Sequence, residues 1–262
     1  MTTSLRAICF DLWETLITNP PDLTRSHKQV RLERMSKILG HPIEKLEGPY
    51  RDVWDRCQDL YWSRDKDVPC RTQIDHFLEA MQLEVDESTT QAVEEAYAFA
   101  IVDFLPTIVP GALEVVRDLK ARGYRLGLIS NTGRTPGYAL RAILDRLGLR
   151  FDAMVFSNEH GACKPQRSIF EALRQALEVD FEEMLFVGDN LYVDVYGALQ
   201  CGITAVHFIP PQRGTAVAPP VEHDLEIQPD ATISDLRELL PLIEVVRTDR
   251  SQPDVRPARG RP

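Results

Sequence analysis

In the second half of the chain, short apolar runs alternate with longer segments whose apolar residues recur at helical spacing. With a further run near the N-terminus, the predicted strands are residues 5–10, 125–129, 152–156, 184–187 and 204–208. The predicted helices of this part are residues 111–122, 136–147, 167–178, 191–201 and 234–245. Strands that alternate with helices are typical of βαβ units around a parallel sheet. The pattern therefore predicts an α/β fold with a Rossmann-like, doubly wound parallel sheet.

The stretch between Thr18 and Pro106 has a different pattern, because helical spacing dominates and no convincing strand occurs in it. Its predicted helices are residues 22–39, 43–63, 72–82 and 87–104. We therefore predict a helical cap at 18–106, inserted into a core that consists of 1–17 and 107–246.

Two segments near the C-terminus have the composition of irregular chain. Residues 210–230 are rich in proline and are expected to form a loop. Residues 247–262 contain five arginines and three prolines and almost nothing to bury, so they are expected to form a disordered tail.

Composition and charge narrow the classes of protein to consider. The 262 residues carry a net charge of −10, so neither nucleic acid nor a membrane surface is expected as a partner. The five cysteines have irregular spacing and no C-x-x-C pair, which argues against a disulfide framework or a zinc site. Since no apolar run approaches 18 residues and no signal peptide is found, we expect a cytoplasmic protein.

Polar side chains follow the predicted strands at four places, namely Asp11, Ser130 with Asn131, Lys164 and Asp189. An aspartate after a strand is usually a turn residue or a helix cap, so one such position carries little information. In an open α/β sheet, however, ligands bind at the carboxyl ends of the strands. A hydroxyl, an ammonium and two carboxylates would converge there, which predicts a catalytic site.

Four motifs contain these residues, and their order and spacing resemble those of the haloacid dehalogenase-like hydrolase superfamily. They are DLWETL (Asp11–Leu16), LISNT (Leu128–Thr132), GACKP (Gly161–Pro165) and FVGDN (Phe186–Asn190), with Asp194 behind the last. The resemblance covers about residues 5–208, and the helical insert resembles the α-helical cap of that superfamily. It implies a hydrolase whose active site lies between core and cap.

The residues also suggest a chemistry of their own. Asp11 can act as a nucleophile, and Asp11 and Asp189 supply the oxygen ligands that Mg²⁺ prefers. Ser130 can donate to a phosphoryl oxygen, and Lys164 can stabilise the charge that develops on it.

The resemblance adds further roles. It implies the backbone carbonyl of Trp13 as a metal ligand and Asp194 as a residue that holds the metal's waters or a neighbouring group. Thr15 joins the predicted catalytic set, and Trp13 joins the predicted substrate-binding set, to which Ser130, Asn131 and Lys164 also belong. For Asn131 and Asn190, an orienting role and local helix capping are equally good interpretations.

One position departs from the phosphatase pattern, which has a second aspartate two residues after the nucleophile as general acid and base. Trp13 stands there, and an indole cannot transfer protons at neutral pH. Glu14, His27 and His160 are substitutes to consider, although a surface or structural role is the simpler interpretation for each.

An aromatic residue at position 13 also makes the chain similar to the 2-haloacid dehalogenase branch of the superfamily. Enzymes of that branch use no metal and have an arginine early in the cap that binds halide. Arg25, Arg31 and Arg34 are equal candidates for that arginine, but the Gly188–Asp189 pair is absent from that branch. A phosphonoacetaldehyde hydrolase would need a reactive lysine in the cap, and the sequence gives no sign of one. A non-catalytic protein would have no need to keep the predicted catalytic and metal-binding residues together.

The leading hypothesis is therefore a Mg²⁺-dependent phosphatase that hydrolyses a small phosphate monoester through an aspartyl-phosphate intermediate. A metal-independent dehalogenase and a non-catalytic binding protein are the alternatives. The expected partner is a small phosphorylated molecule, and the protein is expected to be a monomer or a homodimer.

Overall fold

The computed structural model describes residues 4–211 and 226–251 and contains a six-stranded parallel sheet. The strand order is β5-β4-β1-β6-β7-β8, which places the first strand in the interior of the sheet. The strands are β1 (Ala7–Phe10), β4 (Arg125–Ser130), β5 (Ala153–Phe156), β6 (Met184–Gly188), β7 (Thr204–Phe208) and β8 (Ala231–Ile233). The order reverses between β4 and β6, and this is where an open α/β sheet binds its ligands.

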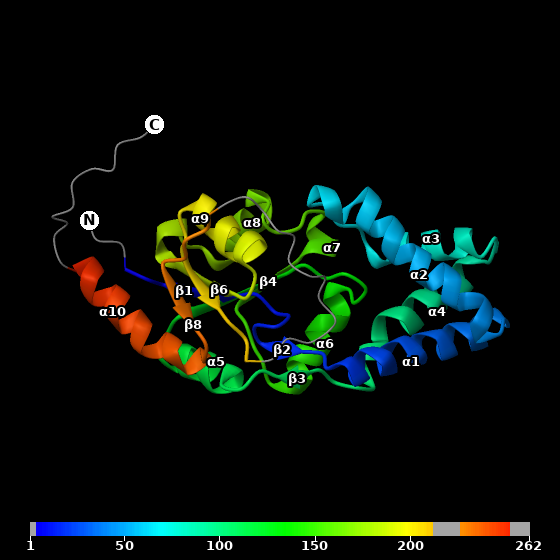
Figure 1. The fold of residues 1–262 in the computed structure, drawn as a ribbon, viewed down its shortest axis with the longest axis horizontal. Coiled ribbons are helices and arrows are strands. Elements are labelled where there is room, and N and C mark those ends of the chain that lie inside the picture. The colour runs from blue at the N-terminus through cyan, green and yellow to red at the C-terminus, as the bar shows by residue number, and fades with distance from the viewer. Residues whose placement is uncertain (1–3, 212–225, 252–262) are drawn as a thin grey trace.

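Helices cover both faces of this sheet, and each face has its own apolar core (Figure 1). Along β1, Ile8 and Phe10 point into one core, whereas Ala7 and Cys9 point into the other. This burial on both sides explains why the strands are continuous apolar runs. The helices are α5 (Ala112–Ala121), α6 (Gly137–Leu147), α7 (Ser157–His160), α8 (Arg167–Leu177), α9 (Gly197–Cys201) and α10 (Leu239–Ser251). Short helical turns lie at Phe181–Glu183 and Leu236–Glu238.

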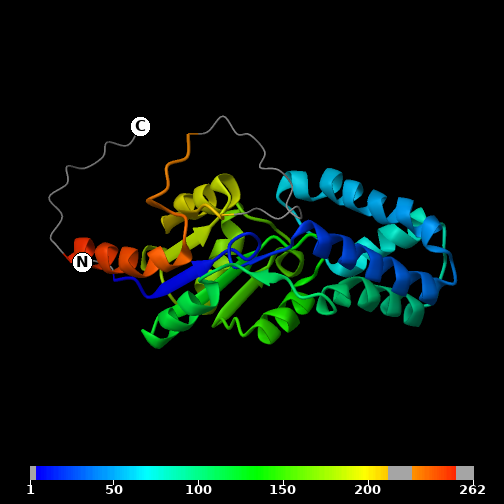
Figure 2. The ribbon, with the colours of Figure 1, turned by 60° about the horizontal axis from the view of Figure 1, so that its bottom comes forward.

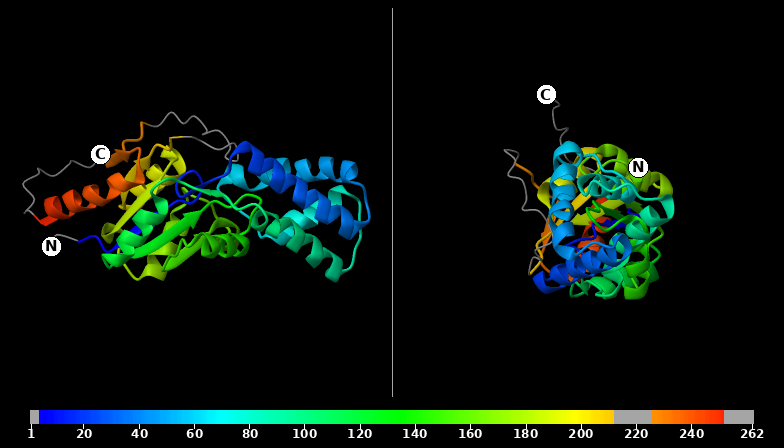
Figure 3. Two further views of the ribbon diagram at one scale, coloured as in Figure 1. Left: turned by 90° about the horizontal axis from the view of Figure 1, so that it is seen from below. Right: turned by 90° about the vertical axis from the view of Figure 1, so that its right-hand side faces the viewer.

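The inserted segment folds as a helical unit around a third apolar core, to which Ala139 of α6 also contributes. Figures 2 and 3 show it at the end of the molecule opposite α10. Its helices are α1 (Pro21–Leu39), α2 (Ile43–Leu60), α3 (Cys70–Ala80) and α4 (Glu87–Ala98), with 3-10 turns at Trp62–Arg64 and Phe99–Val102. The two chain crossings form an antiparallel pair, β2 (Ile17–Thr18) with β3 (Thr107–Ile108).

A second connection joins the cap to the core close to the motif that contains Lys164. The backbone N–H of Cys163 donates to the Asp65 carbonyl at 2.8 Å, and the N–H of Asp67 donates to the Gly161 carbonyl at 3.2 Å. Lys66 and Ala162 form an antiparallel bridge between these two bonds. The cap segment 65–67 is therefore paired directly with the loop that carries the lysine.

Three expectations from the sequence are corrected by the structure. The strand at 204–208 is not the last one, because β8 follows it, and three residues are too few for a periodic signal. The predicted helix 191–201 begins with a π-helical turn, Leu191–Tyr196, before α9. Helix α10 continues to Ser251, so residues 247–251 of the predicted disordered tail are helical. Residues 252–262, and 212–225 of the predicted loop, lie outside the described chain. None of the helices described is long and apolar enough to span a membrane.

Candidate active site

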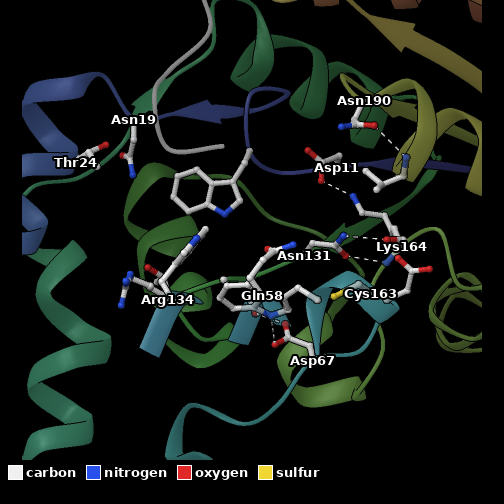
Figure 4. Close-up of a pocket in the computed structure, with 18 of the residues that line it drawn as sticks. Asp11, Asn19, Thr24, Gln58, Asp67, Asn131, Arg134, Cys163, Lys164 and Asn190 are labelled. Atoms are coloured by element: carbon white, nitrogen blue, oxygen red, sulfur yellow. Dashed lines mark hydrogen bonds and ion pairs between the residues drawn. The ribbon is translucent and has the colours of Figure 1, made fainter. Parts of the chain in front are cut away.

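A cavity of about 790 Å³ lies where the carboxyl ends of the core strands face the cap. Asp11 follows β1 and Asp189 follows β6, and both line it together with Lys164 and Asp194. Cap residues form much of the remaining wall, which Figure 4 shows. The convergence that the sequence predicted for the two aspartates and the lysine is therefore present in the structure.

Lys164 is the centre of the charged cluster on the core side of the cavity. Its Nζ donates to Asp11 Oδ1 at 2.5 Å, to Asp194 Oδ1 at 2.7 Å and to the Ile129 carbonyl at 3.2 Å. These three bonds use all three donors of an ammonium group whose residue is only 1% exposed. Burial opposes the charged form, but the two carboxylates outweigh it and raise the pKa of Lys164 above its ordinary value. The lysine is therefore held as a cation.

Asp11 lies in the same buried environment. Burial raises its pKa to about 7, although the nearby Lys164 ammonium acts in the opposite direction. The Thr15 hydroxyl donates to Asp11 Oδ2 at 3.3 Å, while Lys164 contacts Oδ1. Thr15 and Lys164 together therefore fix the orientation of the carboxyl group that the sequence identified as the nucleophile.

Three carboxylates, those of Asp11, Asp189 and Asp194, each place an oxygen atom within 4.8 Å of the others. These side chains form a hard, all-oxygen donor set, which fits a divalent cation such as Mg²⁺. The role of the Trp13 carbonyl as a further ligand stays a prediction.

Two local features hold Asp194 in place. Its Oδ2 accepts from the Asn190 N–H at 3.0 Å, while Oδ1 faces Lys164. A side chain at Gly188 would overlap the Asp194 carboxyl group, so the glycine of the fourth motif makes room for this contact.

The two asparagines that the sequence left undecided have different roles. Asn190 caps the π-helical turn, because its Oδ1 accepts from Tyr192 N at 2.9 Å and Val193 N at 3.1 Å. Asn131 instead accepts from Lys164 N at 2.9 Å and donates to the Lys164 carbonyl at 3.1 Å. Asn131 thus orients the loop that carries the lysine, and local capping describes Asn190 only.

Ser130 and Trp13, which were also predicted as site residues, differ in whether they line the cavity. Ser130 is fully buried, its hydroxyl donates to the Asn131 carbonyl at 3.4 Å, and it is not among the residues that line the cavity. Its predicted contact with a phosphoryl group therefore requires a rotation of the hydroxyl or a small movement. Trp13 does line the cavity.

The three residues considered as substitutes for the missing general acid also differ in whether they line the cavity. Both oxygens of Glu14 accept from the Thr18 hydroxyl, and the side chain is buried away from the cavity. His160 pairs with the Ser168 hydroxyl and does not line the cavity either. His27 does line it, but its Nε2 donates to the Phe104 carbonyl at 2.6 Å, and burial lowers its pKa.

Sequence reasoning missed several polar residues in the cavity wall, among them Arg134, Asp67 and Asn19. Asp67 accepts from Ser157 at 2.5 Å, Thr132 at 3.1 Å, Trp62 at 2.8 Å and its neighbour's N–H at 2.8 Å, and so joins cap to core. Asn19 has a buried Oδ1 without a hydrogen-bond partner in the described structure. Asp67 belongs to the charged stretch SRDKD and Asn19 precedes two prolines, so neither position has a signal in the sequence.

The three cap arginines, which the sequence could not distinguish, are now distinct. Arg25 pairs with Asp22 and Arg34 with Asp103, and both pairs are exposed. Only Arg31 is buried and lines the cavity.

Residues 5–202 match the protein family described as haloacid dehalogenase-like hydrolase, and the chain belongs to this family. It is 31% identical over 252 residues to a glyceraldehyde 3-phosphate phosphatase of Methanopyrus kandleri, covering 94% of this chain and 100% of that protein. A glyceraldehyde 3-phosphate phosphatase of Pyrococcus furiosus is 28% identical, with 92% and 93% covered. A solved 2-haloacid dehalogenase of Pseudomonas syringae pv. Tomato has a TM-score of 0.66 at 22% identity, with 92% and 98% covered, which shows the shared fold. The family predicted from the four motifs is confirmed.

Proposed function

We propose that the protein is a Mg²⁺-dependent phosphatase that hydrolyses a small phosphate monoester with Asp11 as nucleophile. The observation that carries this proposal is a buried cluster at the carboxyl ends of the strands, in which three carboxylates lie within 4.8 Å of one another and Lys164 contacts two of them. Both archaeal relatives are glyceraldehyde 3-phosphate phosphatases, which supports a small phosphate monoester as the class of substrate.

In the proposed reaction, a carboxylate oxygen of Asp11 forms a bond to phosphorus while the bond from phosphorus to the ester oxygen breaks. Lys164 and Thr15 hold the carboxyl group in place, and Asp189 and Asp194 would hold the metal with Asp11. Bound Mg²⁺ would neutralise charge on the phosphoryl oxygens. Water then hydrolyses the aspartyl-phosphate, which releases phosphate and restores Asp11.

The proton for the leaving alcohol has no evident donor at position 13, because Trp13 cannot supply one. Asp67 lines the cavity, but both of its oxygens already accept from core and cap donors. We therefore expect substrates with good leaving groups to react faster.

A second candidate, a metal-independent dehalogenase, is favoured by one observation, since Arg31 is a buried cap arginine in the cavity. The presence of Asp189 beside Asp11 and Asp194 speaks for the phosphatase, because displacement of halide from carbon needs no cation site.

One experiment separates the two. Phosphate release from a panel of small phosphate esters and halide release from 2-chloropropionate are measured with Mg²⁺ and with EDTA. Phosphate release that requires Mg²⁺ is the expected result. Halide release that continues in EDTA would replace the phosphatase with the dehalogenase.

A further inference from the structure

The cap side of the cavity holds a buried guanidinium whose partners are all neutral. Arg31 is 6% exposed and donates to the Tyr97 carbonyl at 2.8 Å, the Thr135 hydroxyl at 2.9 Å and the Tyr50 hydroxyl at 3.4 Å. No carboxylate of the described residues lies within ion-pair distance of it. Two of its five N–H groups make none of these bonds.

A second guanidinium, that of Arg134, lies beside it. Arg134 is placed by the loop after β4, and its guanidinium stacks over the ring of Tyr50, 4.0 Å from the centroid, and lies 5.2 Å from a ring of Trp54. One of its N–H groups donates to the Tyr97 hydroxyl at 3.1 Å. Within residues 4–211 and 226–251 it too has no carboxylate within 4 Å. Figure 4 shows Arg134 across the pocket from Asp11 and Lys164.

Two cations close to the same tyrosine, without an anion, leave this side of the cavity positive. Burial opposes ionisation of Tyr50, yet Arg31 and Arg134 outweigh it and lower the pKa of that hydroxyl. Asp67, which also lines the cavity, uses its oxygens for hydroxyl, indole and amide donors and pairs with neither arginine. A buried charge without a counter-charge is unfavourable, and a bound anion would remove that penalty.

We infer that Arg31 and Arg134 form a second anion subsite, which binds a carboxylate or a second phosphate at the far end of the substrate. The inference rests on the proposed phosphatase function and specifies its substrate class, a small phosphate monoester with a second anionic group. A planar guanidinium with free N–H groups suits the paired oxygens of such a group. The carbonyl end of glyceraldehyde 3-phosphate, the substrate named for the archaeal relatives, carries no such charge.

The test compares three substrates that share a three-carbon skeleton. Glycerol 3-phosphate is neutral at the far end, 3-phosphoglycerate ends in a carboxylate, and glycerol 1,3-bisphosphate ends in a second phosphate. We expect kcat/KM to be about ten- to a hundredfold higher for at least one of the two doubly anionic substrates than for glycerol 3-phosphate. The better of those two identifies the group that the subsite takes.

Variants then assign the preference to the subsite. The preference is the ratio of kcat/KM for the better doubly anionic substrate to kcat/KM for glycerol 3-phosphate. Arg134→Met keeps a long apolar stem against Tyr50 and is expected to remove most of this preference. Arg150→Met is the matched control, because Arg150 is exposed, pairs with Asp145 and does not line the cavity. The control should keep the wild-type ratio. A melting curve of each variant establishes that it is folded, and Arg134→Gln replaces Arg134→Met if the latter is not.

Binding separates failure of this inference from failure of the proposed function. In Asp11→Asn with Mg²⁺, calorimetry measures the dissociation constants of the same three compounds without turnover. Equal kcat/KM values in the wild-type protein, or an unchanged ratio in Arg134→Met, would overturn the subsite while leaving the phosphatase intact. If no phosphate ester is hydrolysed, the phosphatase is wrong, and equal dissociation constants would then overturn the subsite as well.

Discussion

On the core side of the cavity, Lys164 contacts two carboxylates within 2.7 Å, whereas on the cap side the partners of Arg31 and Arg134 among the described residues are carbonyl, hydroxyl and aromatic groups. Lys164 and Arg31 are both buried and Arg134 is partly buried, so exposure to water does not explain the difference between Lys164 and Arg31. On the core side each charge restrains another, which produces a fixed arrangement before any ligand binds. On the cap side the charges are held by neutral groups and remain available to a ligand.

This difference assigns separate tasks to the two sides. A preorganised cluster suits chemistry, because its groups need no rearrangement as charge develops on the reacting phosphoryl group. Cations without a counter-ion suit recognition, since the binding of an anion relieves their burial. The core side thus defines the reaction, and the cap side defines which molecules undergo it.

The largest expected effect comes from removing the nucleophile. Asp11→Asn should reduce turnover by at least about 10⁴-fold, because an amide oxygen is a poor nucleophile while the side chain keeps its shape. The melting temperature should change little, since Lys164 keeps its contacts with Asp194 and Ile129. Steady-state phosphate release measures the turnover, and a thermal melting curve measures the melting temperature. Near-wild-type turnover would show that the reaction does not pass through Asp11.

Removing the metal should have the next largest effect. EDTA should lower phosphate release by at least about 10²-fold, because the cation that neutralises charge on the phosphoryl oxygens beside the three carboxylates is then removed. Saturating Mg²⁺ should raise the melting temperature by roughly 5–10 °C, as a ligand of the native state does. Asp189→Asn should shift the Mg²⁺ dependence of both readings to higher concentration. A melting temperature that does not respond to Mg²⁺ would argue against a metal site here.

The core side could be predicted from sequence because its residues follow strands, and the carboxyl ends of parallel strands meet at one edge. Asp11 and Asp189 come directly after β1 and β6, which are hydrogen-bonded neighbours, so their approach follows from the topology. Lys164 could be assigned only through the motif, since a loop and not a strand positions it.

The cap side could not be predicted, because helical periodicity shows which face is buried but not what faces a cavity. Arg25, Arg31 and Arg34 are indistinguishable in the sequence, and Arg31 is buried by packing of α1 against α4, α2 and the loop after β4. Asp67 lies in a charged stretch, and its role depends on Ser157, 90 residues away. Short β8 was missed for a related reason, since its neighbour β7 and not its own pattern specifies it.

Removing the positive charge of Lys164 tests whether it compensates the carboxylates of Asp11 and Asp194. Lys164→Met leaves Asp11 and Asp194 facing one another without a counter-charge, and breaking such a buried pair typically costs about 3–5 kcal/mol. Activity should fall by about 10²–10³-fold, because the charge on the phosphoryl oxygens loses its nearest cationic side chain. Mg²⁺ should restore part of the lost stability. Denaturant unfolding with and without Mg²⁺ measures the free energy of unfolding of the variant. A decrease of less than about 1 kcal/mol in EDTA would show that Lys164 does not compensate the charges of Asp11 and Asp194.

Trp13 allows a test of the missing general acid. The wild-type enzyme should depend steeply on the pKa of the leaving alcohol, and Trp13→Asp should flatten that dependence, with a gain of roughly tenfold or more for poor leaving groups. Trp13→Phe is the control, since it keeps an aromatic ring and adds no acid. Rates with a series of aryl and alkyl phosphates give the slopes, and melting curves detect a packing defect. A shallow slope in the wild type would mean that another residue supplies the proton, and His27 is then the first to test.

The smallest expected effect is the change in stability of the unliganded protein when a cap cation is removed. Arg134→Met loses one hydrogen bond and its stacking on Tyr50, but it leaves no carboxylate without a counter-charge. The lost contacts and the relieved burial of a charge oppose one another, so the free energy of unfolding should change by no more than about 1 kcal/mol. Arg31→Met, which loses three hydrogen bonds, should cost more than Arg134→Met and less than Lys164→Met. Denaturant unfolding of the three variants in one buffer gives this order directly. If Arg134→Met destabilised the protein as much as Lys164→Met, the guanidinium would have to be part of a charged network, and the contrast between the two sides of the cavity would not hold.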